Sequence, residues 1–276
     1  MAGVNSVVST SRLLMQYARW LPYKLGLINR AAFLLQIKEI LLDDVFLVSY
    51  PKSGNTWLRY IVAYLITKRS DDITLDELEL IVPDVYVSKD TIDKQAGHRF
   101  IKSHHAFYSD YPRTIYIYRD YRDVLVSFYH YQTSLKLFDG DFIQFLKSNQ
   151  LAMPFGSWKE HVSAALKLHE EHPQRILLLS YEALLNNFEN EVIRIASFIG
   201  ADNTQCIHQL KQKTNFKNLR KTENNNGGWY NRLSKQHFFR EGKAGHWKQI
   251  ISPQELEIIY SDSDTVQLLQ KLGYEL

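Results

Sequence analysis

Short apolar runs and longer amphipathic stretches alternate along the chain. The short runs are rich in β-branched, leucine and aromatic residues and are bounded by polar or turn-forming residues, a pattern typical of buried strands. They cover residues 45–50, 99–103, 114–118 and 175–182. The longer stretches repeat apolar residues at helical spacing and predict helices. These cover residues 56–68, 73–80, 121–132, 156–171, 190–200 and 253–273.

Residues that favour helix ends support several of these helices. Ser157 is placed to cap the helix that follows it, Pro173 stops that helix, and Gly200 closes the helix of residues 190–200. Residues 222–247 are instead rich in asparagine and glycine and predict a long, mobile loop.

Because strands alternate with helices, the sequence predicts an α/β fold: a single domain whose central, mostly parallel sheet is flanked by helices. We find no internal repeat and no linker. We divide the chain into an N-terminal helical segment, residues 1–42, and a main domain, residues 43–276.

Composition adds size and charge to this picture. The 276 residues are 45% hydrophobic and 23% charged, which is enough apolar surface for a packed core. The formal net charge of +3 fits a small anionic ligand and is too low to indicate nucleic acid binding. The single cysteine, Cys206, excludes an internal disulfide and a cysteine metal cluster and favours a reducing compartment such as the cytoplasm.

The N-terminal stretch leaves two interpretations open. Its longest uncharged run, Ala31–Ile37, is much shorter than the roughly 18 residues of a membrane span. It also lacks the layout of a cleaved signal peptide. The stretch either packs on the domain as an amphipathic helix or lies on an anionic membrane surface as a peripheral contact. Five basic residues and one acidic residue between positions 12 and 42 favour such a surface.

Residues 49–56, S-Y-P-K-S-G-N-T, connect the first predicted strand to a helix. A strand, a tight polar loop and a helix N-terminus form the geometry of a phosphate-binding loop. Gly54 allows close approach of the backbone to an anion, and the N–H groups of residues 53–56 are expected to converge on it. The Walker pattern is absent, since Asn55 stands where that loop places its lysine and Lys52 precedes the glycine.

Three further groups of residues suit the same chemistry. His104 and His105 follow the strand of residues 99–103, where a histidine can act as general base for a hydroxyl. Arg119 follows the next strand, and Ser127 lies in the helix after it, so a guanidinium fork and a hydroxyl are available to a phosphate. Arg240 and Gly242 suit a second clamp on that phosphate.

The motifs Y-P-K-S-G-N-T-W, R-D-Y-R-D-V-L-V-S-F-Y-H-Y and R-E-G-K-A-G-H-W-K occur in this order between Tyr50 and Lys248. Together they resemble the cytosolic-type sulfotransferases, a likeness that covers roughly three quarters of the chain. The resemblance implies the donor 3′-phosphoadenosine 5′-phosphosulfate (PAPS), the product 3′-phosphoadenosine 5′-phosphate (PAP), and a sulfate ester or sulfamate. It implies a phosphosulfate-binding loop and no metal ion.

The resemblance also implies which residues bind the donor. Those of the 5′-phosphosulfate are Lys52, Ser53, Gly54, Asn55 and Thr56, with Trp57 near the adenine. Those of the 3′-phosphate are Arg119, Ser127, Arg240 and Gly242, and those of the adenine side are Tyr181, Thr214 and Phe216.

The catalytic residues implied are His104, Lys52 and Lys102. His104 takes the proton of the acceptor, with His105 as an alternative base. Lys52 stabilises the leaving phosphate oxygen, and Lys102 adds positive charge at the transferred group. Ser53 is expected to hold Lys52 away from the sulfate until the acceptor arrives.

Some positions depart from the family pattern. Glu241 replaces a lysine beside a phosphate contact, and His246 replaces an aspartate before a tryptophan. The family's dimer motif survives only as Lys248, Ser252, Pro253 and Glu257, and Pro253 removes a backbone donor, so the oligomeric state stays open.

The alternatives to a sulfotransferase are an NTP-dependent kinase of the P-loop type and an inactive, membrane-associated binding protein. The acceptor is expected to be an apolar small molecule or a lipid, because aromatic residues gather in the segments 75–95, 132–158 and 222–240. These aromatic residues are Phe138, Phe142, Phe145, Phe155, Trp158, Trp229 and Tyr230.

Overall fold

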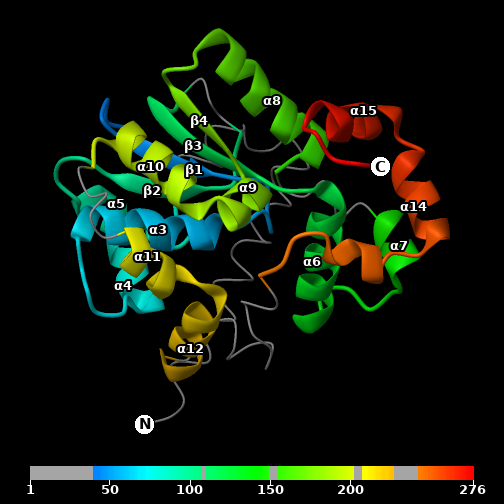
Figure 1. Cartoon of the computed structure of the whole chain (residues 1–276), viewed down its shortest axis with the longest axis horizontal. Coiled ribbons are helices and arrows are strands. Elements are labelled where there is room, and N and C mark those ends of the chain that lie inside the picture. The colour runs from blue at the N-terminus through cyan, green and yellow to red at the C-terminus, as the bar shows by residue number, and fades with distance from the viewer. Residues whose placement is uncertain (1–39, 107–109, 149–154, 202–206, 227–241) are drawn as a thin grey trace.

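Four parallel strands form the central sheet of the part of the chain that the structure describes. The structure is a computed structural model, and it describes residues 40–106, 110–148, 155–201, 207–226 and 242–276 (Figure 1). The strands are β1 (Val45–Val48), β2 (Phe100–Ser103), β3 (Arg113–Tyr118) and β4 (Ile176–Ser180), in the order β2-β1-β3-β4. All pairs are parallel, which confirms the predicted sheet.

The strand order reverses direction at β1. The chain moves from β1 to β2 on one side and then returns to β3 on the other side. In parallel sheets with such a reversal, ligands bind outside the carboxyl ends of the strands. The residues that follow β1, β2, β3 and β4 therefore meet at one edge, and they include the loop at Ser49, His104, Arg119 and Tyr181.

Alternating side chains of β1 divide the core into two layers. Val45 and Leu47 belong to one buried cluster, and Phe46 and Val48 belong to another. The first cluster is covered by α3 (Asn55–Thr67), α4 (Leu75–Ile81), α9 (Tyr181–Asn186), α10 (Phe188–Ile199), α11 (Ile207–Thr214) and α12 (Phe216–Asn226). The second is covered by α5 (Lys89–Lys94), α8 (Trp158–Glu171) and α15 (Ser263–Lys271).

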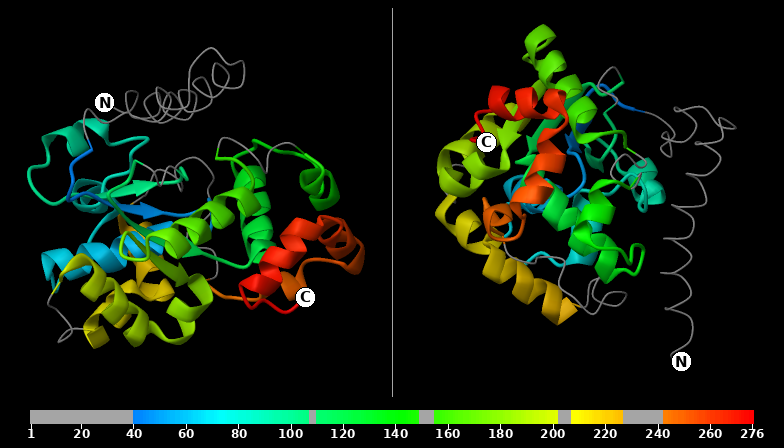
Figure 2. Two further views of the ribbon diagram at one scale, coloured as in Figure 1. Left: turned by 90° about the horizontal axis from the view of Figure 1, so that it is seen from above. Right: turned by 90° about the vertical axis from the view of Figure 1, so that its right-hand side faces the viewer.

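A third cluster lies at one end of the sheet. It is formed by α6 (Tyr121–Ser134), α7 (Phe142–Leu146), the 3-10 helix η3 (His246–Gln249) and α14 (Pro253–Tyr260). Figure 2 shows these helices gathered at that end from two further sides. The cluster matters for the site because it brings α6, which follows Arg119, against the chain after Gly242.

The predicted helix caps are confirmed. Ser157 and Glu160 form a capping box at the start of α8, and Thr74 with Glu77 forms another at α4. Gly200 ends α10 in the left-handed conformation with a φ of 71°.

The prediction of a loop over residues 222–247 is wrong at both ends. Residues 222–226 continue α12, and residues 246–249 form η3. Thr222 and Glu223 are buried, and this packing outweighs the low helix propensity of the asparagines that follow. The predicted strand at 45–50 is also shorter, since a turn begins after Val48 and the N–H of Ser53 donates to the carbonyl of Tyr50 (3.3 Å).

Some predictions lie outside the described residues and stay predictions. They are the N-terminal helix, the phosphate contact of Arg240, the substitution at Glu241, and the aromatic residues Trp229 and Tyr230. Within the described ranges, no helix is long and apolar enough to cross a membrane.

Candidate active site

The loop after β1 has the backbone of an anion-binding turn. Lys52 and Gly54 both have positive φ angles, 71° and 99°, and Gly54 directly precedes α3. The side-chain amide of Asn55 donates to the carbonyl of Leu47 (3.0 Å) and to the hydroxyl of Ser49 (3.3 Å). Asn55 therefore fixes the loop to the end of β1, while its backbone N–H lies at the helix N-terminus.

Ser53 contributes the clearest sign of a bound group. Its side chain is fully buried, and its hydroxyl has no hydrogen-bond partner in the structure. Buried hydroxyls are satisfied in folded proteins, and an oxygen of a bound anion would satisfy this one. The loop thus fits a phosphosulfate group held by Ser53 and by the amides of residues 53–56.

The hydroxyl of Ser53 contacts no donor in the structure. The expectation that Ser53 holds Lys52 away from the sulfate concerns the chain with donor bound, and it stays a prediction. The ammonium of Lys52 lies 4.3 Å from the centre of the Tyr131 ring, on α6. This cation–π contact connects the loop to α6.

Gly54 lies against the ring of Tyr181, the first residue of α9. A Cβ atom at position 54 would lie 2.7 Å from Cδ2 of that ring, so only glycine fits. The indole of Trp57 meets the same ring edge-on at 5.4 Å and stacks on Phe188 at 6.2 Å. Trp57 and Tyr181, which the resemblance places at the adenine, are therefore side by side.

Arg119 connects three parts of the site. Its Nη2 donates to the carbonyl of Lys243 (2.7 Å), and its Nη1 donates to the carbonyl of Lys52 (3.5 Å). The guanidinium also lies 4.4 Å from the centre of the Tyr181 ring. Its Nε is buried without a partner, so donor capacity remains for a ligand. Ser127 lies half-buried on α6, the helix that begins just after Arg119.

Two aspartates near Arg119 hold the later segment in place, and sequence reasoning missed both. Asp123 accepts hydrogen bonds from the N–H groups of Gly245 (2.7 Å) and Trp247 (2.9 Å). Asp120 accepts one from the indole of Trp247 (3.1 Å). The signal was present in the repeated Arg-Asp of R-D-Y-R-D and in the tryptophan of the last motif.

The other residues that the resemblance places at the donor are Thr214, Phe216 and Gly242, and Gly242 is next to Lys243, which Arg119 contacts. Phe216 begins α12, and a Cβ at Gly242 would clash with its ring, so these two residues touch. Thr214 is buried at the end of α11, where its hydroxyl donates to the carbonyl of Leu210 (2.8 Å). The structure thus brings Arg119, Tyr181, Gly242 and Phe216 toward one region.

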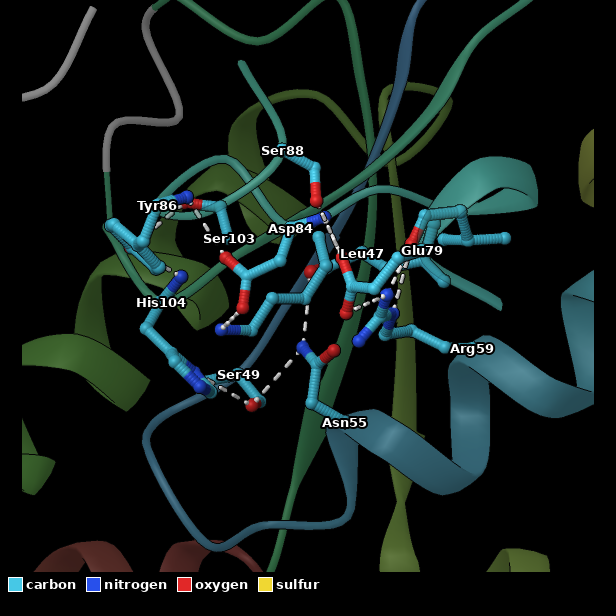
Figure 3. A network of polar contacts seen from close by, with 12 residues as sticks. Leu47, Ser49, Asn55, Arg59, Glu79, Asp84, Tyr86, Ser88, Ser103 and His104 are labelled. Atoms are coloured by element: carbon cyan, nitrogen blue, oxygen red, sulfur yellow. Dashed lines mark hydrogen bonds and ion pairs between the residues drawn. The ribbon is translucent and has the colours of Figure 1, made fainter. Parts of the chain in front are cut away.

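His104 is held in the tautomer that a general base needs. Its Nδ1 lies 2.8 Å from the carbonyl of Ser49 (Figure 3). A carbonyl can only accept, so Nδ1 carries the hydrogen and Nε2 keeps its lone pair. Burial, and then the charge of Lys102, hold the pKa of His104 well below its ordinary value. The imidazole is therefore neutral at physiological pH.

The surroundings of His104 are aromatic. The ring of Tyr86 lies parallel to His104 at 6.3 Å, and Phe155 lies at 5.4 Å. His105 is buried between the same two rings, at 5.3 Å and 4.9 Å. Its backbone N–H donates to the hydroxyl of Ser103 (3.0 Å).

Only one of the described aromatic residues expected to line an acceptor pocket lies beside His104, and this is Phe155. Phe142, Phe145 and Trp158 belong to the buried core, and Phe138 packs edge-on against Phe145. Their distribution reflects packing of α6, α7 and α8, which sequence composition cannot separate from a binding surface.

Lys102 does not extend freely into the site. Its ammonium pairs with the carboxylate of Asp84 at 2.8 Å and lies 4.7 Å from the centre of the Tyr86 ring. Burial lowers the pKa of Lys102, and Asp84 opposes that shift. Among the described residues, no group of three or more histidine, cysteine, aspartate or glutamate side chains is arranged to hold a metal ion.

Comparison with known proteins identifies the family. The profile of the sulfotransferase domain matches residues 42–273. Sulfotransferase 1B1 of Canis lupus familiaris is 30% identical over 258 residues, which cover 83% of this chain and 86% of the relative. Flavonol 4′-sulfotransferase of Flaveria chlorifolia is 31% identical over 245 residues, which cover 79% of this chain and 77% of the relative.

Solved structures share the fold at lower identity. Retinol dehydratase in complex with androsterone and inactive cofactor PAP has a TM-score of 0.65 at 22% identity, covering 86% of this chain and 83% of its own. A mouse sulfotransferase complexed with PAP has a TM-score of 0.64 at 22% identity, covering 88% and 92%. With the profile match over most of its length, this chain belongs to the sulfotransferase family and is a sulfotransferase.

Proposed function

We propose that this chain transfers a sulfuryl group from PAPS to a hydroxyl or amine of an apolar small molecule or lipid. His104 is the general base, and no metal ion takes part. The observation that carries the proposal is the convergence of Lys52, Arg119 and His104 at one sheet edge. Arg119 donates to the carbonyl of Lys52, and His104 donates to the carbonyl of Ser49, so both contact the loop directly.

The residues of the loop fit the donor. Ser53 and the amides of residues 53–56 would bind the phosphosulfate. The 3′-phosphate would be bound by Arg119, Ser127, Arg240 and Gly242. Because ATP has no 3′-phosphate, these contacts would distinguish PAPS from an ordinary nucleotide. Trp57, Tyr181, Thr214 and Phe216 would surround the adenine.

The chemical step then needs one base and one cation. Nε2 of His104 takes the proton of the acceptor hydroxyl as the new oxygen–sulfur bond forms. The ammonium of Lys52 stabilises the electron pair left on the phosphate oxygen from which the sulfuryl group departs. A sulfuryl group carries less negative charge than a phosphoryl group, so a lysine and oriented amides suffice where a kinase uses Mg²⁺.

The surroundings of His104 and the relatives support the proposed acceptor class. Tyr86 and Phe155 form aromatic walls beside His104. One relative is a flavonol sulfotransferase, and a protein of the same fold was solved with androsterone. These observations support an apolar small molecule or lipid with a hydroxyl or amine as the acceptor, used in the cytoplasm.

The N-terminal segment, residues 1–42, is proposed as a separate helical unit beside the sulfotransferase domain, residues 43–276. Its basic, apolar composition favours peripheral contact with anionic membranes. Flotation with anionic vesicles at low and high salt tests this: salt-sensitive binding that is lost on deletion of residues 1–22 supports it, and no flotation rejects it.

Labelled donor tests the activity. The chain is incubated with ³⁵S-labelled PAPS and a panel of a simple phenol, a flavonol, androsterone and retinol, with EDTA or with Mg²⁺. We expect a labelled sulfate ester in the presence of EDTA. Loss of all sulfuryl transfer in EDTA with rescue by Mg²⁺ would contradict a metal-free step, and Mg²⁺-dependent transfer from labelled ATP in place of PAPS would favour the kinase alternative. Binding of PAP without any turnover would favour the inactive binding protein.

A further inference from the structure

The corner of residues 83–85 carries a carboxylate that none of the sequence motifs includes. Asp84 forms a parallel bridge with Lys102 of β2. The N–H of Lys102 donates to the carbonyl of Pro83 (2.8 Å), and the N–H of Val85 donates to the carbonyl of Lys102 (3.1 Å). This corner therefore extends the sheet beside β2, directly next to the strand that ends at His104.

The carboxylate of Asp84 reaches the base by two routes. One oxygen pairs with the ammonium of Lys102 at 2.8 Å, and the other accepts a hydrogen bond from the N–H of Tyr86 (2.9 Å). The hydroxyl of Tyr86 in turn accepts a hydrogen bond from the backbone N–H of His104 (2.8 Å). Figure 3 shows Asp84, Tyr86, Ser103 and His104 in this arrangement.

Buried polar contacts behind Asp84 fix the corner to α3. Glu79 accepts the N–H of Asp84 (3.1 Å) and the hydroxyl of Ser88 (2.8 Å). Glu79 also pairs with Arg59 of α3 at 2.8 Å, and the side chain of Arg59 is almost fully buried. Since α3 begins at the phosphosulfate loop, the corner, the loop and the base belong to one connected network.

We propose that Asp84 is a positioning residue: it holds the ammonium of Lys102 and the backbone of Tyr86 together, and through them it fixes His104. The inference rests on the proposed function, because it takes His104 as the base. In this inference the ammonium of Lys102 binds Asp84. The family resemblance instead implied that Lys102 contacts the transferred group directly.

The pair of Asp84 and Lys102 also affects the pKa of His104. His104 faces Lys102 from β2, His161 from α8 and the neighbouring His105, and Asp84 is the carboxylate that offsets Lys102. Lys102→Met removes the cation and leaves the carboxylate, so the pKa of His104 rises. Asp84 and Lys102 are buried together. Replacing one of them leaves the charge of the other without a partner, whereas replacing both leaves no such charge.

The test uses the full chain with Asp84→Asn, Lys102→Met and the double variant. Asp264→Asn is the control, since Asp264 pairs with Lys159 at 3.2 Å on the surface. We measure PAP affinity by calorimetry, kcat and KM with the best acceptor of the panel, and the His104 titration by NMR. The His104 signals are identified by their loss in His104→Ala.

We expect PAP affinity to stay within about twofold of wild type in every variant. Each single variant should lower kcat by about tenfold to 10²-fold, the effect of a displaced catalytic group. The double variant should be no slower than the slower single variant, and Lys102→Met should raise the pKa of His104. The control should match wild type in all measurements.

Wild-type or higher kcat in Asp84→Asn overturns the inference, because Lys102 would then act directly. Loss of PAP binding together with kcat also overturns it, because Asp84 would then have only a general structural role. If wild type itself binds no PAP and turns over no donor, the proposed function has failed. The backbone amide signal of His104 in the NMR spectrum still decides the inference in that case, since an unshifted signal in Asp84→Asn rejects it.

Discussion

Gly54 packs so closely against Tyr181 that a Cβ atom would lie 2.7 Å from Cδ2 of the ring. Gly54 also has a φ of 99°, a conformation that other residues rarely adopt. Gly54→Ala should therefore distort the loop or displace Tyr181, and both lie at the proposed donor site. We expect PAP affinity to fall by at least about tenfold, roughly 1.4 kcal/mol. Gly97→Ala is the matched control, because a Cβ there meets nothing within 4 Å and its φ is also positive, 79°. Equal PAP affinity in the two variants would contradict this assignment.

Asp123 joins α6 to the segment after Gly242. Its two oxygens accept the N–H groups of Gly245 and Trp247, whereas an asparagine offers one oxygen and turns an NH₂ group toward the second donor. Asp123→Asn should cost about 1 to 3 kcal/mol of this contact and release the segment that Arg119 also binds. We expect weaker PAP binding by calorimetry. Unchanged PAP affinity would show that the segment is held by other contacts.

His104 and His105 are adjacent in sequence but differ in their surroundings. His104→Ala should lower turnover of labelled donor by about 10² to 10⁴, the range for a general base, with PAP affinity nearly intact. His105→Ala should do much less, because it is the ring of His104 that contacts the phosphosulfate loop, at the carbonyl of Ser49. The reverse order of the two effects would move the base to His105.

The pH dependence follows from the depressed pKa of His104, which burial and then Lys102 cause. The neutral base persists as pH falls, so kcat/KM should decline only below about pH 6.5, the ordinary histidine pKa. In that range His104 binds more protons in the unfolded chain than in the folded chain. Its contribution to the free energy of unfolding therefore rises with pH and is lost as pH falls. A pH–rate profile with its acidic limb at or above pH 7 would contradict the assignment.

The fold was predictable because its signals are local. Apolar runs marked the strands within one or two residues, and Ser157 and Gly200 marked helix ends through their capping chemistry. The short helices α5, α7, α9 and α11 were missed. Helix α12 forms despite the low helix propensity of its asparagines, because Glu223 is buried. These outcomes depend on tertiary packing, which periodicity does not contain.

The candidate site was predictable where motifs carry it and not elsewhere. Three residues stood out because each has a charged or titratable side chain and comes soon after a predicted strand. They are Lys52, His104 and Arg119. Asp84 gave no such signal, because an aspartate at a corner is ordinary in sequence. Asp123 was marked by the repeated Arg-Asp of R-D-Y-R-D, but that repeat does not show which residues it binds. Their importance arises from pairs that lie far apart along the chain, Asp84 with Lys102 and Asp123 with Trp247.

Calorimetry with PAP and ATP tests the central claim most directly, because the claim is that the site is built for a nucleotide with a 3′-phosphate. We predict micromolar binding of PAP, roughly −8 kcal/mol, and far weaker binding of ATP. Arg119→Ala should lose about 1.5 to 3 kcal/mol of PAP binding, the size of a charged hydrogen bond. The control Arg69→Ala, which removes a surface ion pair with Asp71, should lose none. Equal affinity of the wild-type chain for PAP and ATP would contradict the account.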